Sequence, residues 1–383
     1  MSGADPVGGA VPVSGADRRI RVGILLGGAS AEREISLASG RMIAEHLPRD
    51  RYEVVLFDSL ALMAGNPALS ADLAQKAQAL LAHAGGHEEL AARDRELPAA
   101  FQREIQSAAA AAAPATDALQ TAEGKRRIDV AFIALHGPYG EDGTLQGMLE
   151  IVGIPYVGSG VLASALAMDK TMAAKMLAAE GIPVAQAVVI EREESDGLDE
   201  ETMLRAEAML PAFVKPSRQG SSLGMSLVCR PDELRPALER AFEYDNRILV
   251  EERLEGREIT VGVIGNRRLT ALPVVEIVTR REFFDYRAKY DPDLSKEICP
   301  ADLPPDEVKT IQDLALSAHR ALDCRGYSRV DMILTADRGA VVIEVNTLPG
   351  MTINSLFPKA AAAAGIPFGE LLDRLVRLAL DDE

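Results

Sequence analysis

The chain has few basic residues and few cysteines for its length of 383 residues. Its 41 lysines and arginines stand against 58 acidic residues, which gives a formal net charge of −17. That balance argues against a surface that binds nucleic acid or an anionic membrane. The three cysteines are widely spaced and show no metal-ligand or redox pattern, which is typical of a protein of the reducing cytoplasm.

Long apolar runs are absent as well. No stretch approaches the roughly 20 apolar residues that are needed to cross a bilayer. Residues 1–18 are rich in Gly, Ala, Ser and Pro and lack the apolar core of a signal peptide, so we expect a disordered tail and a soluble protein. The length suffices for two or three domains with cores of their own. Because no G-x-x-x-x-G-K-[ST] run occurs, a P-loop NTPase is disfavoured.

The N-terminal part alternates apolar strands with helical patterns and predicts an α/β domain over residues 19–159. Its first strand, at 19–26, ends in a glycine pair and is followed by a helix, the order in which α/β domains build a ligand-facing loop. Glu32 lies near the start of that helix, where a carboxylate could serve a ligand or simply complement the helix dipole. The segment at about 60–125 is rich in Ala, Leu, Gln and Glu and is interpreted as an insertion without visible chemistry.

A second ligand-facing turn is predicted where the apolar strand at 128–135 runs into the sequence HGPYGEDG at 136–143. A strand that delivers His136 into a glycine-rich turn is typical of a binding site, because glycine lets backbone amides approach a ligand closely. After a further short strand, the sequence Gly-Ser-Gly at 158–160 marks the expected end of the first domain.

The central part, residues 160–251, is predicted to hold a phosphate site. One helix is expected to run through Asp169 and Lys170. Lys215 ends a later strand and stands at the base of a loop of small residues at 216–225. Backbone amides and hydroxyls of such a loop can donate to phosphate oxygens while the lysine supplies charge.

Two features at the junction with the last part, residues 252–383, leave alternatives open. Glu251 ends a strand, where its carboxylate could bind an adenine amino group or ribose hydroxyls, or could be an ordinary solvated strand end. The segment at 283–292 is aromatic and charged without a clean period, so it could be a lid over a ligand or a packed surface loop.

The most informative pattern is a β-hairpin, because turn formers at 335–339 separate two apolar strands. A turn centred at positions 337 and 338 would set Asp331 opposite Glu344. The same register sets Arg329 opposite Asn346, and all four side chains then share one face. The other face is expected to be apolar and to carry Val330, Met332, Ile343 and Val345.

Two carboxylates that face each other across a ladder repel unless a cation lies between them. Oxygen ligands with open coordination positions suit Mg²⁺, which commonly uses one or two carboxylates together with substrate phosphates. We therefore interpret this face as a platform for magnesium and phosphate. The alternative is a solvated polar face on which Arg329 bridges the two acids.

Four motifs, at 136–143, 215–225, 283–290 and 329–351, occur in an order that resembles the D-alanine–D-alanine ligase family of ATP-grasp enzymes. The resemblance extends from about residue 19 to the C-terminus and leaves out the insertion. It implies an α/β (α+β) protein with a three-domain ATP-grasp fold and an N-terminal Rossmann-like α/β domain. It also implies a cytoplasmic homodimer that uses ATP to join two D-alanines through D-alanyl phosphate, for peptidoglycan precursors.

The resemblance assigns roles to single residues. ATP would be held by Lys170, Lys215, Glu251, Leu254, Glu258 and Lys289, with the lysines on its phosphates. A pair of Mg²⁺ ions, which Mn²⁺ could replace, would be held by Asp331, Glu344 and Asn346. Catalysis would involve Glu32 on the ammonium of the first D-alanine, in a network with Ser221 and Tyr290, and an oxyanion hole formed by Arg329 and the amide of Gly350. The remaining substrate contacts would come from His136, Ser355 and Leu356.

Three other functions remain possible on the same residues. One is another ATP-grasp carboxylate–amine ligase, which would share the metal hairpin and the lysines but not the amino-acid pocket. A second is a ligase that makes D-alanyl-D-lactate, although Tyr290 resembles the dipeptide-forming type. The third is a nucleotide-binding protein without turnover, which would have no need of the metal and oxyanion residues together.

Overall fold

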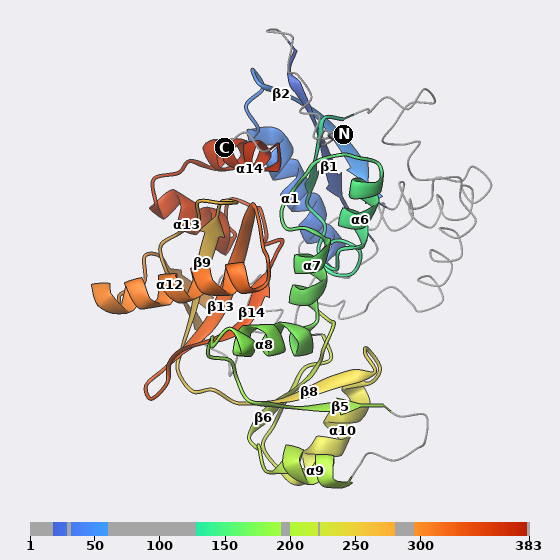
Figure 1. Cartoon of the computed structure of the whole chain (residues 1–383), viewed down its shortest axis with the longest axis vertical. Coiled ribbons are helices and arrows are strands. Elements are labelled where there is room, and N and C mark those ends of the chain that lie inside the picture. The colour runs from blue at the N-terminus through green and yellow to red at the C-terminus, as the bar shows by residue number, and fades with distance from the viewer. Residues whose placement is uncertain are drawn as a thin grey trace, which may run out of the picture.

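The computed structural model of the protein describes residues 18–28, 32–59, 128–192, 200–220, 223–279 and 295–380. Three β-sheets and the helices that cover them make up this part of the chain (Figure 1). Residues 1–17 of the tail expected at 1–18, the expected insertion at about 60–125 and the aromatic segment at 283–292 lie outside the described residues. The last residue of that tail, Arg18, is described and forms an ion pair of 3.0 Å with Asp129. None of the described helices is long and apolar enough to cross a membrane.

The first sheet is parallel and has the strand order β2-β1-β3-β4. Its central strands are apolar along most of their length, as is usual in a parallel sheet that is covered on both faces. Because neighbouring parallel strands end at the same edge, the turns after β1 and β3 lie side by side. The bounds are β1 Ile20–Leu26, α1 Arg33–His46, β2 Tyr52–Asp58, β3 Val130–Ile133, α6 Thr144–Ile151 and β4 Tyr156–Val157.

The second sheet is antiparallel and has the order β5-β8-β6-β7. Helices α9 and α10 cover it, and their apolar side chains form a core with its strands (Figure 1). The acidic stretch between β5 and β6 contains α9. The bounds are β5 Ala187–Glu191, α9 Glu200–Glu207, β6 Ala212–Pro216, β7 Ser226–Val228, α10 Pro231–Ala241 and β8 Arg247–Glu252.

The third sheet is antiparallel, with the order β12-β11-β9-β13-β14 and with β10 paired to β9. Its core includes side chains from α7, α8 and α12. Strands β11 and β12 and helix α13 were not predicted from the sequence. The bounds are β9 Arg257–Ile264, β10 Thr270–Ala271, β11 Val275–Thr279, β12 Ser295–Ile298, α12 Pro305–Ala321, β13 Tyr327–Thr335, β14 Gly339–Asn346, α13 Leu356–Ala363 and α14 Phe368–Ala379.

The hairpin of β13 and β14 has the predicted register at its polar end. Asp331 is paired with Glu344, and Arg329 is paired with Asn346. On its other side β13 is paired with β9, so Arg329 and Asp331 lie on an interior strand of the described sheet. The pairing that suggested a site is therefore confirmed.

A β-bulge follows Asp331 and changes the register toward the turn, so that Met332 is paired with Val342 instead of Ile343. The core of this sheet accordingly contains Val342, whereas Ile343 is only partly buried, which corrects the predicted core face. Bulges bend a strand and increase its local twist, and they are frequent next to active sites.

The single helix predicted through Asp169 is wrong. The structure has two helices, α7 Val161–Met168 and α8 Lys170–Ala179, which run in clearly different directions (Figure 1). Asp169 lies between them with an extended backbone, and its side chain accepts hydrogen bonds from the amides of Thr171 and Met172 at 3.1 and 3.2 Å. An aspartate at this position satisfies amides that have no partner inside the helix. The break places Lys170 in the first turn of α8.

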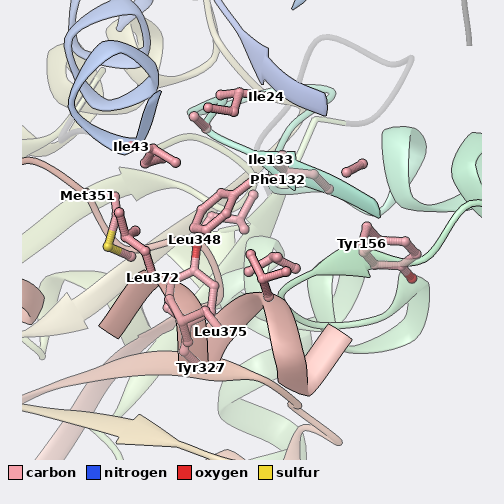
Figure 2. Packing of buried hydrophobic residues seen from close by; sticks show 14 of the residues in the cluster. Ile24, Ile43, Phe132, Ile133, Tyr156, Tyr327, Leu348, Met351, Leu372 and Leu375 are labelled. Atoms are coloured by element: carbon pink, nitrogen blue, oxygen red, sulfur yellow. The ribbon is translucent and has the colours of Figure 1, made fainter. Parts of the chain in front are cut away.

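The largest apolar core joins segments that are far apart in the sequence. Phe132 of β3 and Leu375 of α14 belong to it, together with Leu348 and Met351 of the loop after β14 (Figure 2). Leu348 and Met351 are each 2% exposed and lie on either side of Gly350. Burial of these two side chains fixes the backbone of the loop that carries Gly350.

Candidate active site

The polar face of the hairpin gathers a shielded arginine and two acids. The guanidinium of Arg329 donates to both carboxylate oxygens of Asp331, at 2.7 and 2.6 Å. It also lies 3.9 Å from a carboxylate oxygen of Glu344. Asp331 accepts a further hydrogen bond of 2.5 Å from the hydroxyl of Thr260 on β9. A cation therefore lies near both acids. In this structure it is the guanidinium of Arg329, as in the alternative interpretation in which Arg329 bridges the two acids.

Asn346 completes this face at the end of β14. It is paired with Arg329 across the ladder. Its side-chain oxygen accepts a hydrogen bond of 2.9 Å from the amide of Leu348, which fixes the direction of the amide group. An amide oxygen has two lone pairs, so a second partner such as a cation can still be bound.

The backbone beyond the hairpin is held close to Ser355. A Cβ atom at Gly350 would lie 3.0 Å from the hydroxyl oxygen of Ser355, so glycine permits an approach that a side chain would obstruct. The same hydroxyl is 2.8 Å from that of Thr352. Ser355 stands just before α13 and Leu356 is the first residue of that helix. Gly350, Ser355 and Leu356, which were predicted as site residues, are therefore close together.

Glu32 and His136 follow neighbouring strands of the first sheet and meet the hairpin. Burial lowers the pKa of His136, and Arg329 acts in the same sense while the carboxylate of Glu32 opposes it. A Cβ atom at Gly220, in the loop after β6, would lie 3.9 Å from a carboxylate oxygen of Glu32 and 4.0 Å from one of Glu141. Segments from three sheets therefore converge at one place.

Glu141 is a member of this site that the sequence reasoning missed. Its carboxylate accepts a hydrogen bond of 2.7 Å from the amide of Gly137 in the same turn. Burial, followed by the nearby carboxylate of Glu32, raises the pKa of Glu141 to about 8, and Glu344 acts in the same sense. A carboxyl group with this pKa is largely protonated at neutral pH. The only signal in the sequence was its place in the glycine-rich turn, because its neighbours come from distant segments.

The two described lysines that were predicted to contact phosphate both lie at the loop after β6. The ammonium group of Lys170 donates to the carbonyl oxygen of Gln219 at 2.5 Å. The backbone amide of Lys170 donates to the carbonyl oxygen of Ser217 at 2.9 Å. Lys215 forms a buried ion pair with Glu251 on the adjacent strand β8. Glu251 is therefore not a solvated strand end.

The other predicted ATP residues are less closely defined. Leu254 lies in the connection between β8 and β9 and is partly buried. Glu258 is on β9, paired with Ile333 of β13, and is also partly buried. Ser221, Lys289 and Tyr290 lie outside the described residues.

The hairpin face offers oxygen atoms that suit a metal ion. Among the described residues, no group of three or more His, Cys, Asp and Glu side chains could hold a metal by itself. Mg²⁺, however, commonly binds one or two carboxylates and completes its coordination with water and phosphate oxygens. Asp331 and Glu344, paired across the ladder, with Asn346 two pairs further on and on the same face, fit such a site.

Two family models match most of the chain. The model described as D-ala D-ala ligase N-terminus matches residues 21–159, and the one described as D-ala D-ala ligase C-terminus matches residues 176–377. The chain belongs to the D-alanine–D-alanine ligase family. It is 42% identical over 366 residues to a D-alanine–D-alanine ligase of Syntrophobacter fumaroxidans, which covers 95% of this chain and 99% of the relative. It is 41% identical over 370 residues to D-alanine–D-alanine ligase A of Chromobacterium violaceum, with coverages of 95% and 96%.

Solved structures of ligases have the same fold. The VanG D-Ala:D-Ser ligase from Enterococcus faecalis matches with a TM-score of 0.72 and 32% identity, over 94% of this chain and 100% of that one. The D-alanine–D-alanine ligase from Bacillus anthracis, complexed with ATP, matches with a TM-score of 0.69 and 31% identity, over 95% and 98%. The predicted fold class is confirmed: the chain has the three-domain ATP-grasp fold with an N-terminal Rossmann-like α/β domain.

Proposed function

We propose that this protein joins two molecules of D-alanine into D-alanyl-D-alanine with the hydrolysis of ATP to ADP and phosphate, for the synthesis of peptidoglycan precursors. Its membership of the D-alanine–D-alanine ligase family over nearly the whole chain supports this reaction. The structural observation that carries it is the convergence of Glu32 and His136, the loop after β6 and the Arg329 hairpin at one place.

The first half-reaction activates a carboxylate. A carboxylate is a poor electrophile, so an oxygen of the first D-alanine attacks the γ-phosphorus of ATP, ADP leaves and an acyl phosphate results. Both reactants are anionic, and they repel unless cations screen them. Lys170, whose ammonium group contacts the loop after β6, and Lys215, at the base of that loop, would supply that charge, and Lys289 is proposed as a third phosphate contact. Glu251, Leu254 and Glu258 would line the rest of the nucleotide site.

The second half-reaction forms the amide bond. The amine of the second D-alanine attacks the acyl carbon, its extra proton is lost, and phosphate leaves as the tetrahedral oxyanion collapses. Arg329 and the amide of Gly350 are proposed as the donors to that oxyanion. A guanidinium does not deprotonate at working pH, so Arg329 can act only through its charge and its hydrogen bonds.

Asp331, Glu344 and Asn346 would hold a pair of Mg²⁺ ions, with Mn²⁺ as a substitute. Such cations would supply positive charge against the charge that develops in phosphoryl transfer.

The amino-acid pocket is proposed to lie between the first sheet and α13. Glu32 would bind the ammonium group of the first D-alanine in a network with Ser221 and Tyr290. His136, Ser355 and Leu356 would contact the substrates from the other sides. Glu32 lies near His136, which supports a shared pocket. Ser355 lies beside Gly350, which supports a substrate contact near the proposed oxyanion hole.

The same proposal covers the organisation of the chain. In this proposal the chain consists of a tail at 1–18, an N-terminal substrate domain at 19–159, a central domain at 160–251 and a C-terminal domain at 252–383. We also propose that the protein works in the cytoplasm as a homodimer.

A product assay tests the reaction. The full chain, ATP, Mg²⁺ and D-alanine should release equimolar phosphate and dipeptide, with D-serine and D-lactate as parallel second substrates. Release with D-lactate alone would overturn the choice of nucleophile. Binding of ATP without turnover on any amino acid would instead favour a nucleotide-binding protein. Activity unaffected by Glu32→Gln and Tyr290→Phe would favour a different ATP-grasp ligase.

A further inference from the structure

The break between α7 and α8 runs against the local sequence. Residues 161–179 consist mostly of Ala, Leu, Met and Lys, which are strong helix formers, and a continuous helix would be the locally favoured conformation. One residue, Asp169, leaves the helical region, with φ −88° and ψ 98°. Conflicts between local preference and structure are expected where function or distant contacts require them.

Distant contacts hold Asp169 in this conformation. Besides capping α8, one carboxylate oxygen accepts a hydrogen bond of 2.7 Å from the hydroxyl of Ser217. The other oxygen lies 3.2 Å from the guanidinium of Arg247, at the start of β8. Arg247 is itself paired with Glu191 at 2.7 Å. The break is therefore attached to the second sheet at two points.

Ser217 contacts both the break residue Asp169 and the first turn of α8. It is fully buried, and its hydroxyl is also 2.9 Å from that of Thr171 in α8. Its carbonyl oxygen accepts from the amide of Lys170 at 2.9 Å, an amide at the start of the helix that has no partner within it. Its own amide donates to the carbonyl of Arg247 at 2.9 Å. Ser217 thus supplies a carbonyl acceptor for the amide of Lys170 and a hydroxyl donor for the carboxylate of Asp169, and neither would be needed if the helix were continuous.

The loop stem that carries Ser217 is fixed on its far side as well. The carboxylate of Asp245 accepts from the amide of Arg218 at 2.8 Å and from its guanidinium at 2.7 Å. The next residue, Gln219, receives the ammonium group of Lys170 on its carbonyl oxygen. Residues 217–219 and the first turn of α8 are consequently bonded into one unit.

We propose that Asp169 is a positioning residue which, through its hydrogen bond with Ser217, keeps α7 and α8 apart and holds Lys170 against the loop after β6. Loss of this bond leaves the helix-forming sequence free to continue from α7 into α8. A continuous helix would change the direction of Lys170 and separate it from Gln219. The consequence for nucleotide rests on the proposed function, in which Lys170 and this loop bind the phosphates of ATP.

The test compares three variants of the full chain. Ser217→Ala removes the hydroxyl that contacts Asp169 and Thr171 but keeps the hydrogen bonds from the amides of Thr171 and Met172 to Asp169. Asp169→Ala removes both the bond with Ser217 and this cap, and Asp169→Asn retains an acceptor oxygen. Binding of a non-hydrolysable ATP analogue with Mg²⁺ is measured by calorimetry in the absence of D-alanine. We expect Ser217→Ala and Asp169→Ala to raise the Kd roughly tenfold, the equivalent of about one hydrogen bond, and Asp169→Asn to raise it less.

A second measurement reports on the helices directly. Hydrogen exchange of the amides at 170–172 should change in Ser217→Ala and Asp169→Ala, because in a continuous helix their acceptors would be carbonyl oxygens of α7 instead of Ser217 and Asp169. The matched control is Glu233→Ala, which removes the side chain that accepts from the amides of Cys229 and Arg230 at the start of α10. This control should lower stability without changing the Kd for the analogue.

The outcomes separate the two proposals. An unchanged Kd and unchanged exchange in Ser217→Ala would overturn the positioning role, and so would an equal rise of the Kd in Glu233→Ala. If Asp169→Ala does not fold, Ser217→Ala alone decides, because it keeps the cap. A wild-type protein that binds the analogue but makes no dipeptide would overturn the proposed function and leave the positioning role standing.

Discussion

Arg329 binds the two acids of the hairpin unequally, so substitutions of Asp331 and Glu344 should differ in their effect on stability. It forms two short hydrogen bonds with Asp331 but approaches Glu344 only to 3.9 Å. We expect Glu344→Gln to lower turnover by at least the roughly 10- to 100-fold that is typical of losing an outer partner of a metal ion. Without metal, the melting temperature should stay or rise, because one of two repelling carboxylates is removed. Steady-state kinetics and thermal unfolding in a chelator measure both effects.

Asp331→Asn is the informative comparison. It should lower turnover as strongly, but it should also lower the stability of the metal-free protein by about 1–2 kcal/mol, because charge-assisted hydrogen bonds from Arg329 are lost. A large loss of stability in Glu344→Gln would contradict the idea that these acids are held together for a cation. Equal melting temperatures for the two variants would show that the pairing with Arg329 contributes little.

Glu141 gives a prediction for the pH dependence of stability. Its pKa in the folded protein is about 8, against an ordinary value of 4.5. Between these two values the folded state binds a proton that the unfolded state has lost, so the free energy of unfolding falls as the pH rises. Glu141→Gln keeps an acceptor for the amide of Gly137 and removes this titration. The variant should therefore be more stable than the wild type at pH 8, by a few kcal/mol at most.

Urea unfolding of the metal-free protein at pH 5 to 8 tests this expectation. The difference between variant and wild type should grow with pH. Glu45→Gln, at an exposed position of α1, serves as the control and should follow the wild type at every pH. Parallel curves for Glu141→Gln and the wild type would show that the carboxyl group is ionised throughout.

Single residues also show what the sequence could and could not predict. The pairing of Asp331 with Glu344 was predicted from a turn centred between 337 and 338, and it is observed because the bulge after Asp331 offsets the one-residue difference in register next to the turn. The part of Glu141 in the site was not predicted, because its pKa depends on Glu32 and Glu344, which lie more than 100 positions away on either side. Local pattern reports on neighbours in the chain, whereas this pKa depends on neighbours in space.

Among the elements, the loop between β14 and α13 yields a prediction about close packing. An alanine at 350 would place its Cβ 3.0 Å from the hydroxyl oxygen of Ser355 and 3.6 Å from the Cβ of that residue. The first contact is too close and the second is normal. Gly350→Ala should therefore displace the amide at 350 or the start of α13 and lower kcat/KM for D-alanine about tenfold, or about 1.4 kcal/mol.

A double-mutant cycle with Ser355→Ala checks the cause. Removing the hydroxyl also removes the short contact, so Gly350→Ala should cost much less in the Ser355→Ala background than in the wild type. Gly147→Ala is the control, because a Cβ there would meet Val161 only at 3.8 Å. Strictly additive effects would indicate that Gly350 tolerates a side chain and acts in some other way.

Elements differ in how far their sequence determines them. The strands of the first sheet were predicted to within a few residues, because a parallel sheet buried on both faces leaves long apolar runs. The break at Asp169 was not predicted, because the residue that stabilises it, Ser217, is 48 positions away. The bulge after Asp331 was not predicted either, because the sequence has the same apolar residues whether Met332 is paired with Val342 or with Ile343.

For the whole molecule, the decisive feature is that α14 packs on the first sheet. Asp373 of α14 is 7% exposed and accepts hydrogen bonds from the hydroxyl of Tyr52 at 2.7 Å and from the guanidinium of Arg51 at 2.8 Å. Burial, with the bond to Asp373 acting in the same sense, raises the pKa of the Tyr52 hydroxyl. The first sheet and the C-terminal helix are thus joined by a buried hydrogen bond and a partly buried ion pair beside the core that they share.

This arrangement predicts that the two ends of the chain unfold together. Asp373→Ala leaves the buried hydroxyl of Tyr52 without its acceptor and should lower the free energy of unfolding by about 2–4 kcal/mol. Arg374→Ala, on the exposed side of the same helix, breaks only a solvated pair with Glu370 and should cost a few tenths of a kcal/mol. Urea unfolding, followed by far-UV circular dichroism and by hydrogen exchange in β1 and β3, measures both. If Asp373→Ala accelerated exchange in α14 while β1 and β3 kept their wild-type protection, the helix would be a separable appendage rather than part of the first domain's core.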